Sequence, residues 1–396
     1  MHNLQKIRLF RILLYCTYLP AFVLLYPFAL LKRKSNGRLF FFFDRYVIGG
    51  AQRVHLDILE SVREQEKMIF FTRLSPNDGL KGEFYSVPNS ITRDIHFYCD
   101  NLILRLFSVH FYAFYLNRHK NVHVFSSNST FFYDMLPFLS KKLIKSELLH
   151  NFTLGNNGME FFGLANHQYL DNRMVIDAAT MKNIKEQYET CGVPHMYLGC
   201  IKLIEPGVFI PENRKKETVL PIKILYAGRG GAQKRIFLLD RIARQCLDEK
   251  LPVTFHFAGT MMNELSDYVK TNSTIHGEIS GVKQMYSLYE QCDVILMTSA
   301  YEGFPMLIKE GMACSCIPLV TALEGNKTHL QSGENALLIT NIEDENALVA
   351  EAMSHIKSLI LDSALRIQIC ANAYSYARQH FDKKQFIDGY RKFLST

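Results

Sequence analysis

The chain has 396 residues, a length that suits two domains of ordinary size, each able to bury its own core. Hydrophobic residues make up 48% of it and charged residues 21%, which is typical of a globular protein and excludes a disordered or fibrous one. The net charge of +7 is modest, so we expect no nucleic-acid partner. The nine cysteines include no Cys-x-x-Cys pair, which predicts a reduced protein without disulfides or a zinc site.

Residues 1–37 differ in composition from the rest of the chain. An uncharged run, residues 12–31, lies between basic residues on both sides. The run is long enough to cross a bilayer, but Pro20 and Pro27 would break a straight helix. A spanning helix, an interfacial or re-entrant anchor and a soluble helix docked on the core all remain open. In the membrane cases, residues 8–34 contact the membrane surface.

The next segment predicts a first α/β domain. Residues 38–44 form an apolar strand, Gly49 and Gly50 a tight turn, and residues 51–62 a helix with one apolar face. Further buried strands are predicted at 67–72, 122–127, 147–151, 174–178 and 196–204. Residues 90–118, rich in Phe, Tyr and Leu, predict core helix, with an exposed aromatic patch that meets lipid as the alternative.

The second half of the chain alternates apolar strands with helical segments. Strands are predicted at 223–227, 253–258, 274–276, 294–299, 317–320 and 336–339. Repeated βα units predict a doubly wound parallel sheet. Residues 211–221, polar and bounded by prolines, are the predicted linker between the two domains, and later helices begin near residues 344, 363 and 383.

Two glutamates stand near the start of a predicted helix in the second domain. An apolar strand ends before Glu302 and Gly303, and the helix begins at about Pro305, with Glu310 about two turns in. Ligands of parallel sheets bind outside the carboxyl ends of the strands, and a helix start attracts phosphate. A carboxylate can also accept two hydrogen bonds from a sugar diol. The pattern predicts a nucleotide-sugar site; the alternative is a capping box at Ser299 and a solvated Glu310.

A glycine-rich turn with two basic residues follows the first strand of that domain. Gly228 and Arg229 come directly after the strand, and Lys234 precedes the next helix. The planar guanidinium of Arg229 can grip a diphosphate, and Lys234 can add a charge where negative charge grows on a leaving phosphate. A solvated loop with ordinary surface charges is the alternative. A dinucleotide fingerprint is disfavoured, because it requires Gly or Ala where Gln233 stands.

Together these motifs resemble those of the retaining glycosyltransferases of family 4, which have the GT-B fold. Glu302 and Glu310 resemble the E-x7-E motif of that family. The loop 228–234 resembles its G-R-x4-K loop, and Gly49-Gly50 resembles its glycine turn near the N-terminus. The three motifs occur in the expected order, and the resemblance covers nearly the whole chain.

The resemblance implies an α/β protein of GT-B architecture, with two Rossmann-like doubly wound domains facing across a cleft and an N-terminal apolar helical segment. The implied divisions are a membrane-associating segment, an acceptor domain, a nucleotide-sugar-binding domain and a helix that returns to the first domain: residues 1–37, 38–210, 211–382 and 383–396.

The resemblance also implies a reaction, the retaining transfer of a sugar from a nucleotide-diphosphate sugar, with a UDP-sugar as the expected donor. The acceptor would be a hydroxyl of a lipid-linked or polysaccharide molecule, as in bacterial surface-polysaccharide assembly. No Asp-x-Asp triplet occurs, and the family is generally metal-independent, so neither a metal nor a cofactor is expected. The protein would lie on the cytoplasmic face of the membrane, as a peripheral or singly anchored enzyme.

Individual residues receive roles by the same resemblance. Catalytic roles are implied for Glu302, Arg229, Lys234 and His150. Donor contacts are implied for Glu310, Gly303, Phe304, Gly228, Gly49 and Gly50. A lone histidine at a strand end is often structural, which is the alternative for His150. Two other functions remain open, a GT-B enzyme that isomerises or hydrolyses a nucleotide sugar and an inactive nucleotide-sugar-binding scaffold.

Overall fold

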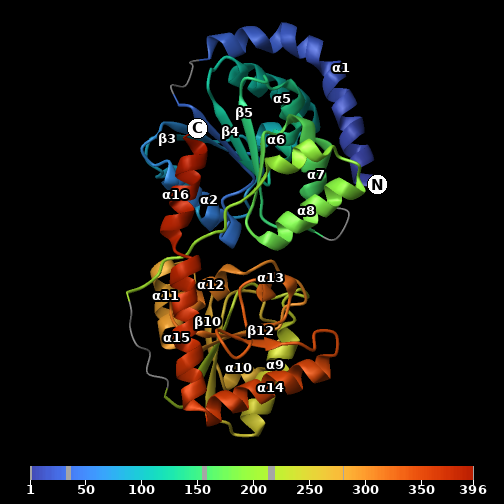
Figure 1. The fold of residues 1–396 in the computed structure, drawn as a ribbon. Coiled ribbons are helices and arrows are strands. Elements are labelled where there is room, and N and C mark those ends of the chain that lie inside the picture. Colours follow the sequence, from blue (N-terminus) through green and yellow to red (C-terminus); the bar gives the residue numbers. More distant parts are fainter. Residues whose placement is uncertain (1, 33–36, 154–157, 213–218, 280, 396) are drawn as a thin grey trace. The chain divides into compact units, whose positions relative to one another are not determined.

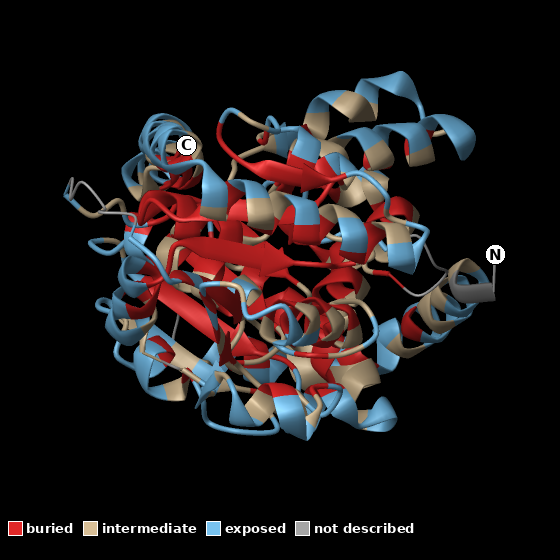
Figure 2. Cartoon of the chain, turned by 90° about the horizontal axis from the view of Figure 1, so that it is seen from below, coloured by how far each residue is buried: buried red, intermediate tan, exposed pale blue. Residues whose placement is uncertain are grey.

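The computed structural model describes residues 2–32, 37–153, 158–212, 219–279 and 281–395 (Figure 1). The chain forms two compact units, Met1–Glu205 with Ile387–Thr396, and Pro206–Phe386. The predicted linker 211–221 and the basic residues 33 and 34 lie partly or wholly outside the described residues. In both units the buried residues concentrate in the strands and the exposed residues on the outer helices (Figure 2).

The first unit is built on a seven-stranded parallel sheet in the order β3-β2-β1-β4-β5-β6-β7. Its strands are β1 (Leu39–Phe43), β2 (Lys67–Phe71), β3 (Ser90–Asp94), β4 (His123–Ser127), β5 (Ile144–Leu149), β6 (Asn172–Val175) and β7 (Ile201–Leu203). β1 reads Leu-Phe-Phe-Phe-Phe and is buried throughout, as expected of a parallel strand covered on both faces. The predicted strand 196–204 is shorter, because His195–Cys200 forms a 3-10 helix.

The helices of this unit follow the strands on both sides of the sheet (Figure 1). They are α1 (His2–Leu31), α2 (Gly50–Ser61), α3 (Lys81–Tyr85), α4 (His96–Asp100), α5 (Leu102–Asn117), α6 (Thr130–Met135), α7 (Glu160–Ala165) and α8 (Ala178–Thr190). The prediction of helix throughout residues 90–118 was wrong at its start, where β3 forms the sheet edge. Its residues are exposed or half-buried in alternation, so β3 lacks the apolar run that marks the central strands.

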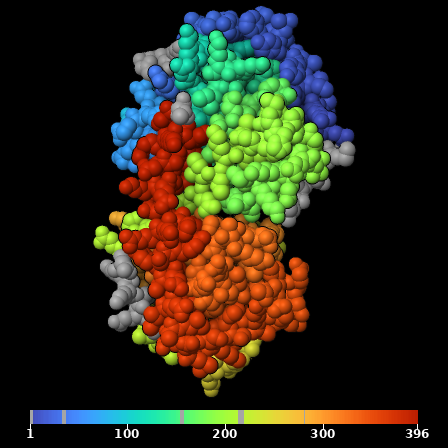
Figure 3. All heavy atoms as spheres, in the orientation of Figure 1, coloured from blue at the N-terminus to red at the C-terminus, as the bar shows by residue number. Residues whose placement is uncertain are grey.

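The apolar helix α1 is docked on this unit and curves around α5 (Figures 1 and 3). It is continuous through Pro20 and Pro27. The Arg11 guanidinium donates to the Ala165 carbonyl at 3.1 Å, and the Thr17 hydroxyl lies 3.1 Å from His110 Nε2. By length and composition, residues 4–31 could cross a membrane.

The second unit is a six-stranded parallel sheet in the order β10-β9-β8-β11-β12-β13. Its strands are β8 (Ile222–Ala227), β9 (Val253–Ala258), β10 (Thr274–Gly277), β11 (Val294–Met297), β12 (Ile317–Thr321) and β13 (Leu337–Ile339). Its helices are α9 (Ile236–Asp248), α10 (Asp267–Thr271), α11 (Val282–Gln291), α12 (Met306–Ala313), α13 (Glu324–Lys327), α14 (Glu345–Leu361) and α15 (Ser363–His380), followed by α16 (Lys383–Leu394), which leaves the unit. Both predicted parallel sheets are therefore confirmed.

The last helix, α16, belongs to both units. Its start is joined to the second unit, where the Lys383 N–H donates to the Val208 carbonyl at 2.9 Å. From Ile387 onward its residues belong to the first unit. There Tyr390 is fully buried, with its ring centroid 6.1 Å from that of Phe125 on β4.

A buried ion pair crosses two strands of the first unit. Arg173 on β6 pairs with Glu147 on β5, and each side chain is 1% exposed. The Tyr133 hydroxyl donates a hydrogen bond to the Glu147 carboxylate. The Arg173 guanidinium donates a hydrogen bond to the Tyr188 hydroxyl at 3.0 Å. A buried charge that loses its partner destabilises the folded state, so removing either residue alone should destabilise this unit.

We expect Arg173→Met to lower the free energy of unfolding by about 3–5 kcal/mol, because it leaves the Glu147 carboxylate buried and unpaired. The double variant Arg173→Met with Glu147→Met should regain most of that loss, since it removes both charges. Urea unfolding of the two variants measures the difference. A double variant as unstable as the single one would contradict this account.

Candidate functional site

The loop after β8 is shaped by glycines that admit close backbone contacts. Gly228 has φ 150°, a conformation that side chains with a Cβ rarely adopt. A Cβ at Gly230 would lie 1.9 Å from the Met261 carbonyl oxygen, so only glycine fits there. Between them Arg229 is exposed, and its Nε lies 3.0 Å from the Met261 sulfur. The predicted diphosphate ligand Arg229 therefore stands on a rigid turn with its guanidinium open to solvent.

The loop after β11 carries the predicted Glu302 and Gly303. α12 begins at Met306 with Pro305 as its N-cap, so the helix start predicted at about Pro305 is confirmed and the alternative capping box at Ser299 is wrong. The backbone at Gly303 packs closely against Gly325. A Cβ at Gly325 would lie 2.2 Å from the Gly303 carbonyl oxygen, so position 325 requires glycine.

The structure brings these two loops together. Lys234 forms a salt bridge with Glu302, and the two side chains are 21% and 14% exposed. The Ala300 N–H donates to the Gln233 carbonyl at 2.8 Å, and the Gln233 side chain donates to the Tyr301 carbonyl at 2.8 Å. The predicted phosphate cation and the predicted sugar contact are thus direct neighbours at the carboxyl ends of adjacent strands.

Arg235, which the sequence analysis did not single out, holds the same two loops. It has φ 50° and immediately precedes α9. Its guanidinium donates to the carbonyls of Thr298 at 2.6 Å, Ser299 at 3.1 Å and Ile342 at 2.9 Å. The only signal in the sequence was a second basic residue directly after Lys234. Arg235 is a positioning residue, because all these contacts go to the backbone.

Glu310 has a different partner from Glu302. It lies on α12 and accepts a hydrogen bond from the Tyr289 hydroxyl on α11 at 2.7 Å. Burial, together with the charge of Glu310, raises the pKa of Tyr289 well above its usual value, so the phenol stays protonated and donates. Tyr289 also escaped the sequence analysis, since a tyrosine on a neighbouring helix carries no motif. It orients the carboxylate predicted to bind the ribose.

The Phe304 ring faces the core of the second unit. It is 6% exposed, 4.5 Å from the His329 ring and 5.4 Å from the Phe381 ring by their centroids. The ammonium of the buried Lys309 lies 5.5 Å from the Phe304 ring centroid. A donor contact at Phe304 is therefore left to its backbone, because the side chain is occupied by packing.

In the first unit, the predicted glycine turn begins a helix and the predicted histidine meets a second histidine. Gly49 is the N-cap of α2 and has an extended φ of 179°, which other residues also adopt, and Gly50 is the first helical residue.

His150 follows β5, and its Nε2 lies 2.9 Å from Nε2 of His55 on α2. His55 is fully buried and its ring stacks on Phe43 at 4.2 Å.

The two histidines are held in their neutral forms. Burial lowers the pKa of His150 to about 4, and burial and the neighbouring His150 lower the pKa of His55 well below its usual value. One ring therefore donates and the other accepts in the hydrogen bond between them. A neutral, 6%-exposed His150 can orient a neighbour by hydrogen bonding. His55 lies among the buried residues of α2, where no sequence pattern indicates a site.

No group of three or more His, Cys, Asp or Glu side chains in the described part of the chain is arranged to hold a metal ion. Of the charged residues predicted for the site, Lys234 and Glu302 pair with each other, whereas Arg229 contacts Met261 and Glu310 contacts Tyr289.

Comparison with known proteins identifies the class of the second unit. Residues 221–358 match the family model described as glycosyl transferases group 1. The chain is 26% identical over 175 residues to an uncharacterized glycosyltransferase of Methanocaldococcus jannaschii, a match that covers 42% of this chain and 46% of that relative. The match thus spans less than half of the relative's length.

Solved structures share the whole fold at low identity. HepE of Anabaena, crystallised with UDP, superposes with a TM-score of 0.69 at 17% identity over 90% of this chain and 99% of that one. The pneumococcal O-GlcNAc transferase GtfA, in complex with UDP and GlcNAc, gives 0.70 at 12% identity over 91% and 99%. The chain therefore has the GT-B fold, and its second unit carries a group 1 glycosyltransferase domain.

The pKa of the buried histidines predicts how stability depends on pH. Above about pH 6.5 they are neutral in both the folded and the unfolded chain. As the pH falls from about 6.5 to about 4, only the unfolded chain takes up protons, so stability decreases. We expect His150→Gln to reduce this slope by up to about 1.4 kcal/mol per pH unit.

Urea unfolding at several pH values measures the slope. His195→Gln, at an exposed histidine of the same unit, is the matched control. Equal slopes for the original chain and His150→Gln would show that His150 is not held neutral.

Proposed function

We propose that this protein is a retaining, metal-independent glycosyltransferase of family 4. It moves a sugar from a UDP-sugar to a hydroxyl of a lipid-linked or polysaccharide acceptor. The observation that carries the proposal is the meeting of Lys234 and Glu302 at the carboxyl ends of β8 and β11, inside the group 1 domain. Two relatives of the same fold are crystallised with UDP, which supports the choice of donor.

The basic residues would carry the phosphate chemistry. In the transfer, the acceptor oxygen bonds to the anomeric carbon while the bond from that carbon to the phosphate oxygen breaks. The bonding electrons go to the diphosphate, which takes the hydroxyl proton, so that the products are the glycoside and UDP. Arg229 and Lys234 stabilise the growing charge on the diphosphate, and two fixed cations perform the role that a divalent metal performs elsewhere.

The carboxylates would hold the sugars of the donor. Glu310, oriented by Tyr289, accepts hydrogen bonds from the ribose diol. Lys234 would hold Glu302 beside the diphosphate. There the Glu302 carboxylate would accept a hydrogen bond from the transferred sugar. His150 would contribute a neutral imidazole that donates or accepts a hydrogen bond without adding charge.

The protein would act at the cytoplasmic face of a membrane, bound through α1. The side of α1 that faces away from the unit is apolar: Leu9, Ile12, Leu19, Val23, Phe28 and Leu31 are all more than half exposed. Its inner side makes polar contacts with α5 and with the end of α7. A docked helix with an apolar outer face suits the membrane surface, where that face enters the interfacial region.

We expect UDP to raise the melting temperature of the purified protein, with EDTA making no difference, because binding to the folded state stabilises it. GDP, ADP and CMP are tested in parallel. Lys234→Met should weaken UDP binding by about ten-fold or more, the effect of losing one charged hydrogen bond, and Glu310→Ala should weaken it through the ribose. Lys270→Met, at a lysine of the same unit whose side chain is 39% exposed, is the matched control.

The outcomes separate the candidate functions. UDP binding that is equal in Lys234→Met and Lys270→Met would overturn the phosphate assignment. Consumption of UDP-sugar without any acceptor would favour an isomerase or hydrolase. Binding of UDP with no turnover over a panel of acceptors would favour a scaffold.

For the membrane, we expect Leu19→Asp with Val23→Asp to weaken binding to anionic vesicles by about ten-fold or more, since each buried apolar side chain is worth about 1.5–3 kcal/mol. Leu361→Asp, which changes an 86%-exposed leucine of the second unit, should bind as the original chain does. Sedimentation with vesicles measures both. Equal binding of all three proteins would rule out the outer face of α1 as the contact.

A further inference from the structure

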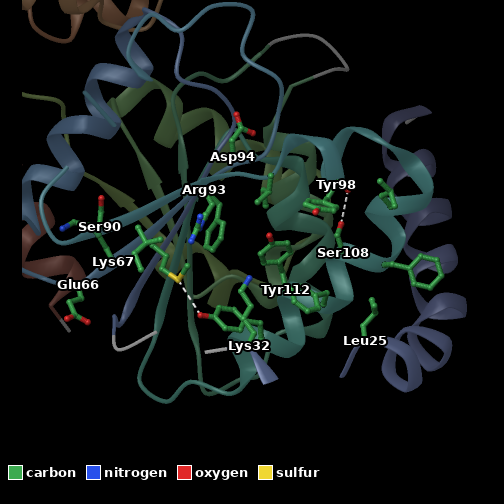
Figure 4. A pocket seen from close by; sticks show the side chains of 18 of the residues that line it. Leu25, Lys32, Glu66, Lys67, Ser90, Arg93, Asp94, Tyr98, Ser108 and Tyr112 are labelled. Atoms are coloured by element: carbon green, nitrogen blue, oxygen red, sulfur yellow. Dashed lines mark hydrogen bonds between the residues drawn. The ribbon is translucent and has the colours of Figure 1, made fainter. Parts of the chain in front are cut away.

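The first unit contains a large cavity away from the site described above. Its volume is about 1120 Å³, slightly above the range of about 300–1,000 Å³ typical of ligand pockets. It lies between the edge strand β3 and its neighbour β2 on one side and α5 with the end of α1 on the other (Figure 4). The volume is therefore sufficient for a ligand of considerable size.

The walls of the cavity are mainly apolar and aromatic. Phe70 of β2 forms part of one wall, and Leu104, Phe107, Phe111, Tyr112 and Tyr115 of α5 form the other. Two further lining residues, Ile91 and Tyr98, are 49% and 48% exposed, so apolar surface continues to the outside. Such a lining suits a hydrocarbon chain rather than a sugar, which needs many hydrogen-bond partners.

Two cations face this apolar space. The Lys32 ammonium lies 5.3 Å from the ring centroids of Phe111 and Tyr112 and 4.9 Å from that of Tyr115. Arg93 of β3 points into the same space (Figure 4). Neither the Lys32 ammonium nor the Arg93 guanidinium makes a hydrogen bond or salt bridge to any residue that the structure describes. Burial, and to a lesser extent the charge of Arg93, lower the pKa of Lys32. The charged form of Lys32 is therefore disfavoured as long as no anion is bound.

The other charged residues of the cavity do not neutralise these two. Lys67 donates to the Gln65 and Pro88 carbonyls at 2.8 Å each, which satisfies its ammonium. Asp94 accepts from the Tyr46 hydroxyl at 3.1 Å and lies 2.6 Å from His96 Nδ1. Glu66 is exposed and points away from the cavity (Figure 4). The half-buried Lys32 and the exposed Arg93, which have no counter-charge among the described residues, favour an anion between them.

We propose that this cavity binds an anionic phospholipid of the membrane, with one acyl chain along the aromatic wall and its phosphate at Lys32 and Arg93. The surroundings favour a bilayer as the source. Leu25 and Lys32 connect the cavity to α1, whose outer face is apolar, and the neighbouring residues Phe97, Leu102 and Ile103 are 60–68% exposed. A chain can pass from a membrane on that side into the cavity without crossing water.

The position of the cavity separates this lipid from the acceptor. The lining includes Lys67 and Ser90, the first residues of β2 and β3, and Asp94, the last residue of β3. The cavity therefore runs along the strands, whereas reacting ligands of such sheets bind beyond the carboxyl ends. The bound lipid is a fixed contact with the membrane, and it is independent of the proposed transfer.

The test uses dodecyl phosphate, a soluble single-chain anion, at concentrations below micelle formation. Calorimetry on the full chain should show saturable binding at one site per chain. Inorganic phosphate and dodecyl maltoside, which offer the head charge alone and a neutral chain, should bind at least ten-fold more weakly. Arg93→Gln and Lys32→Gln should each weaken dodecyl phosphate about ten-fold, as expected for one charge-assisted contact.

Two further variants keep the test specific. Leu104→Trp fills the cavity from a half-buried position and should abolish binding at one site per chain. Lys141→Gln removes one exposed charge of the same unit and should bind as the original chain does. Melting temperatures within the error of the original chain exclude misfolding, and UDP binding by each variant should be unchanged.

Three results would overturn the proposal. The first is binding that is equally weak in Lys141→Gln and Arg93→Gln. The second is inorganic phosphate binding as tightly as dodecyl phosphate. The third is a result of native mass spectrometry on the protein purified from membranes. The proposal expects an anionic phospholipid to remain bound to the protein. A polyprenyl phosphate retained in its place would show that the cavity holds an acceptor carrier.

Discussion

The candidate site depends on cations that hold two loops against each other. Lys234 pairs with Glu302, and Arg235 donates to three carbonyls, two of which belong to the loop after β11. Loops at the carboxyl ends of parallel strands have few backbone partners of their own, so side-chain contacts fix their positions. Glycines at positions 228, 230 and 325 then allow the backbones to approach closely. The proposed phosphate site therefore also depends on residues, such as Arg235, whose contacts go to the backbone of the loops.

The two units use their buried charge differently. In the second unit the charged groups of the candidate site remain partly exposed, as a site that exchanges ligands requires. In the first unit, Arg173 and Glu147 are almost completely buried and pair with one another. Lys32 and Arg93 belong to neither case, because Lys32 is half-buried, Arg93 is exposed, and neither is paired with a carboxylate among the described residues. That imbalance distinguishes the cavity beside α5 from an ordinary packing defect.

Much of the fold could be predicted because parallel sheets have a strong signature. A central strand buried on both faces must be apolar throughout, and Leu39–Phe43 and Val294–Met297 are. The edge strand Ser90–Asp94 was not predicted, because it is less covered than a central strand and its sequence therefore mixes polar and apolar residues. The 3-10 turn at His195–Cys200 escaped for a related reason, since short irregular segments have no period to detect.

The sequence by itself determined the class of fold, the order of the motifs and the chemical groups of the candidate site, because these follow from local patterns and spacing. Only the tertiary structure decided which partners those groups have. Arg235, Tyr289 and His55 are separated in sequence from the residues they contact, and no local pattern marks a contact between elements far apart in the chain. The docking of α1 and the cavity at Lys32 and Arg93 were decided in the same way, since both depend on how helices pack on a sheet edge.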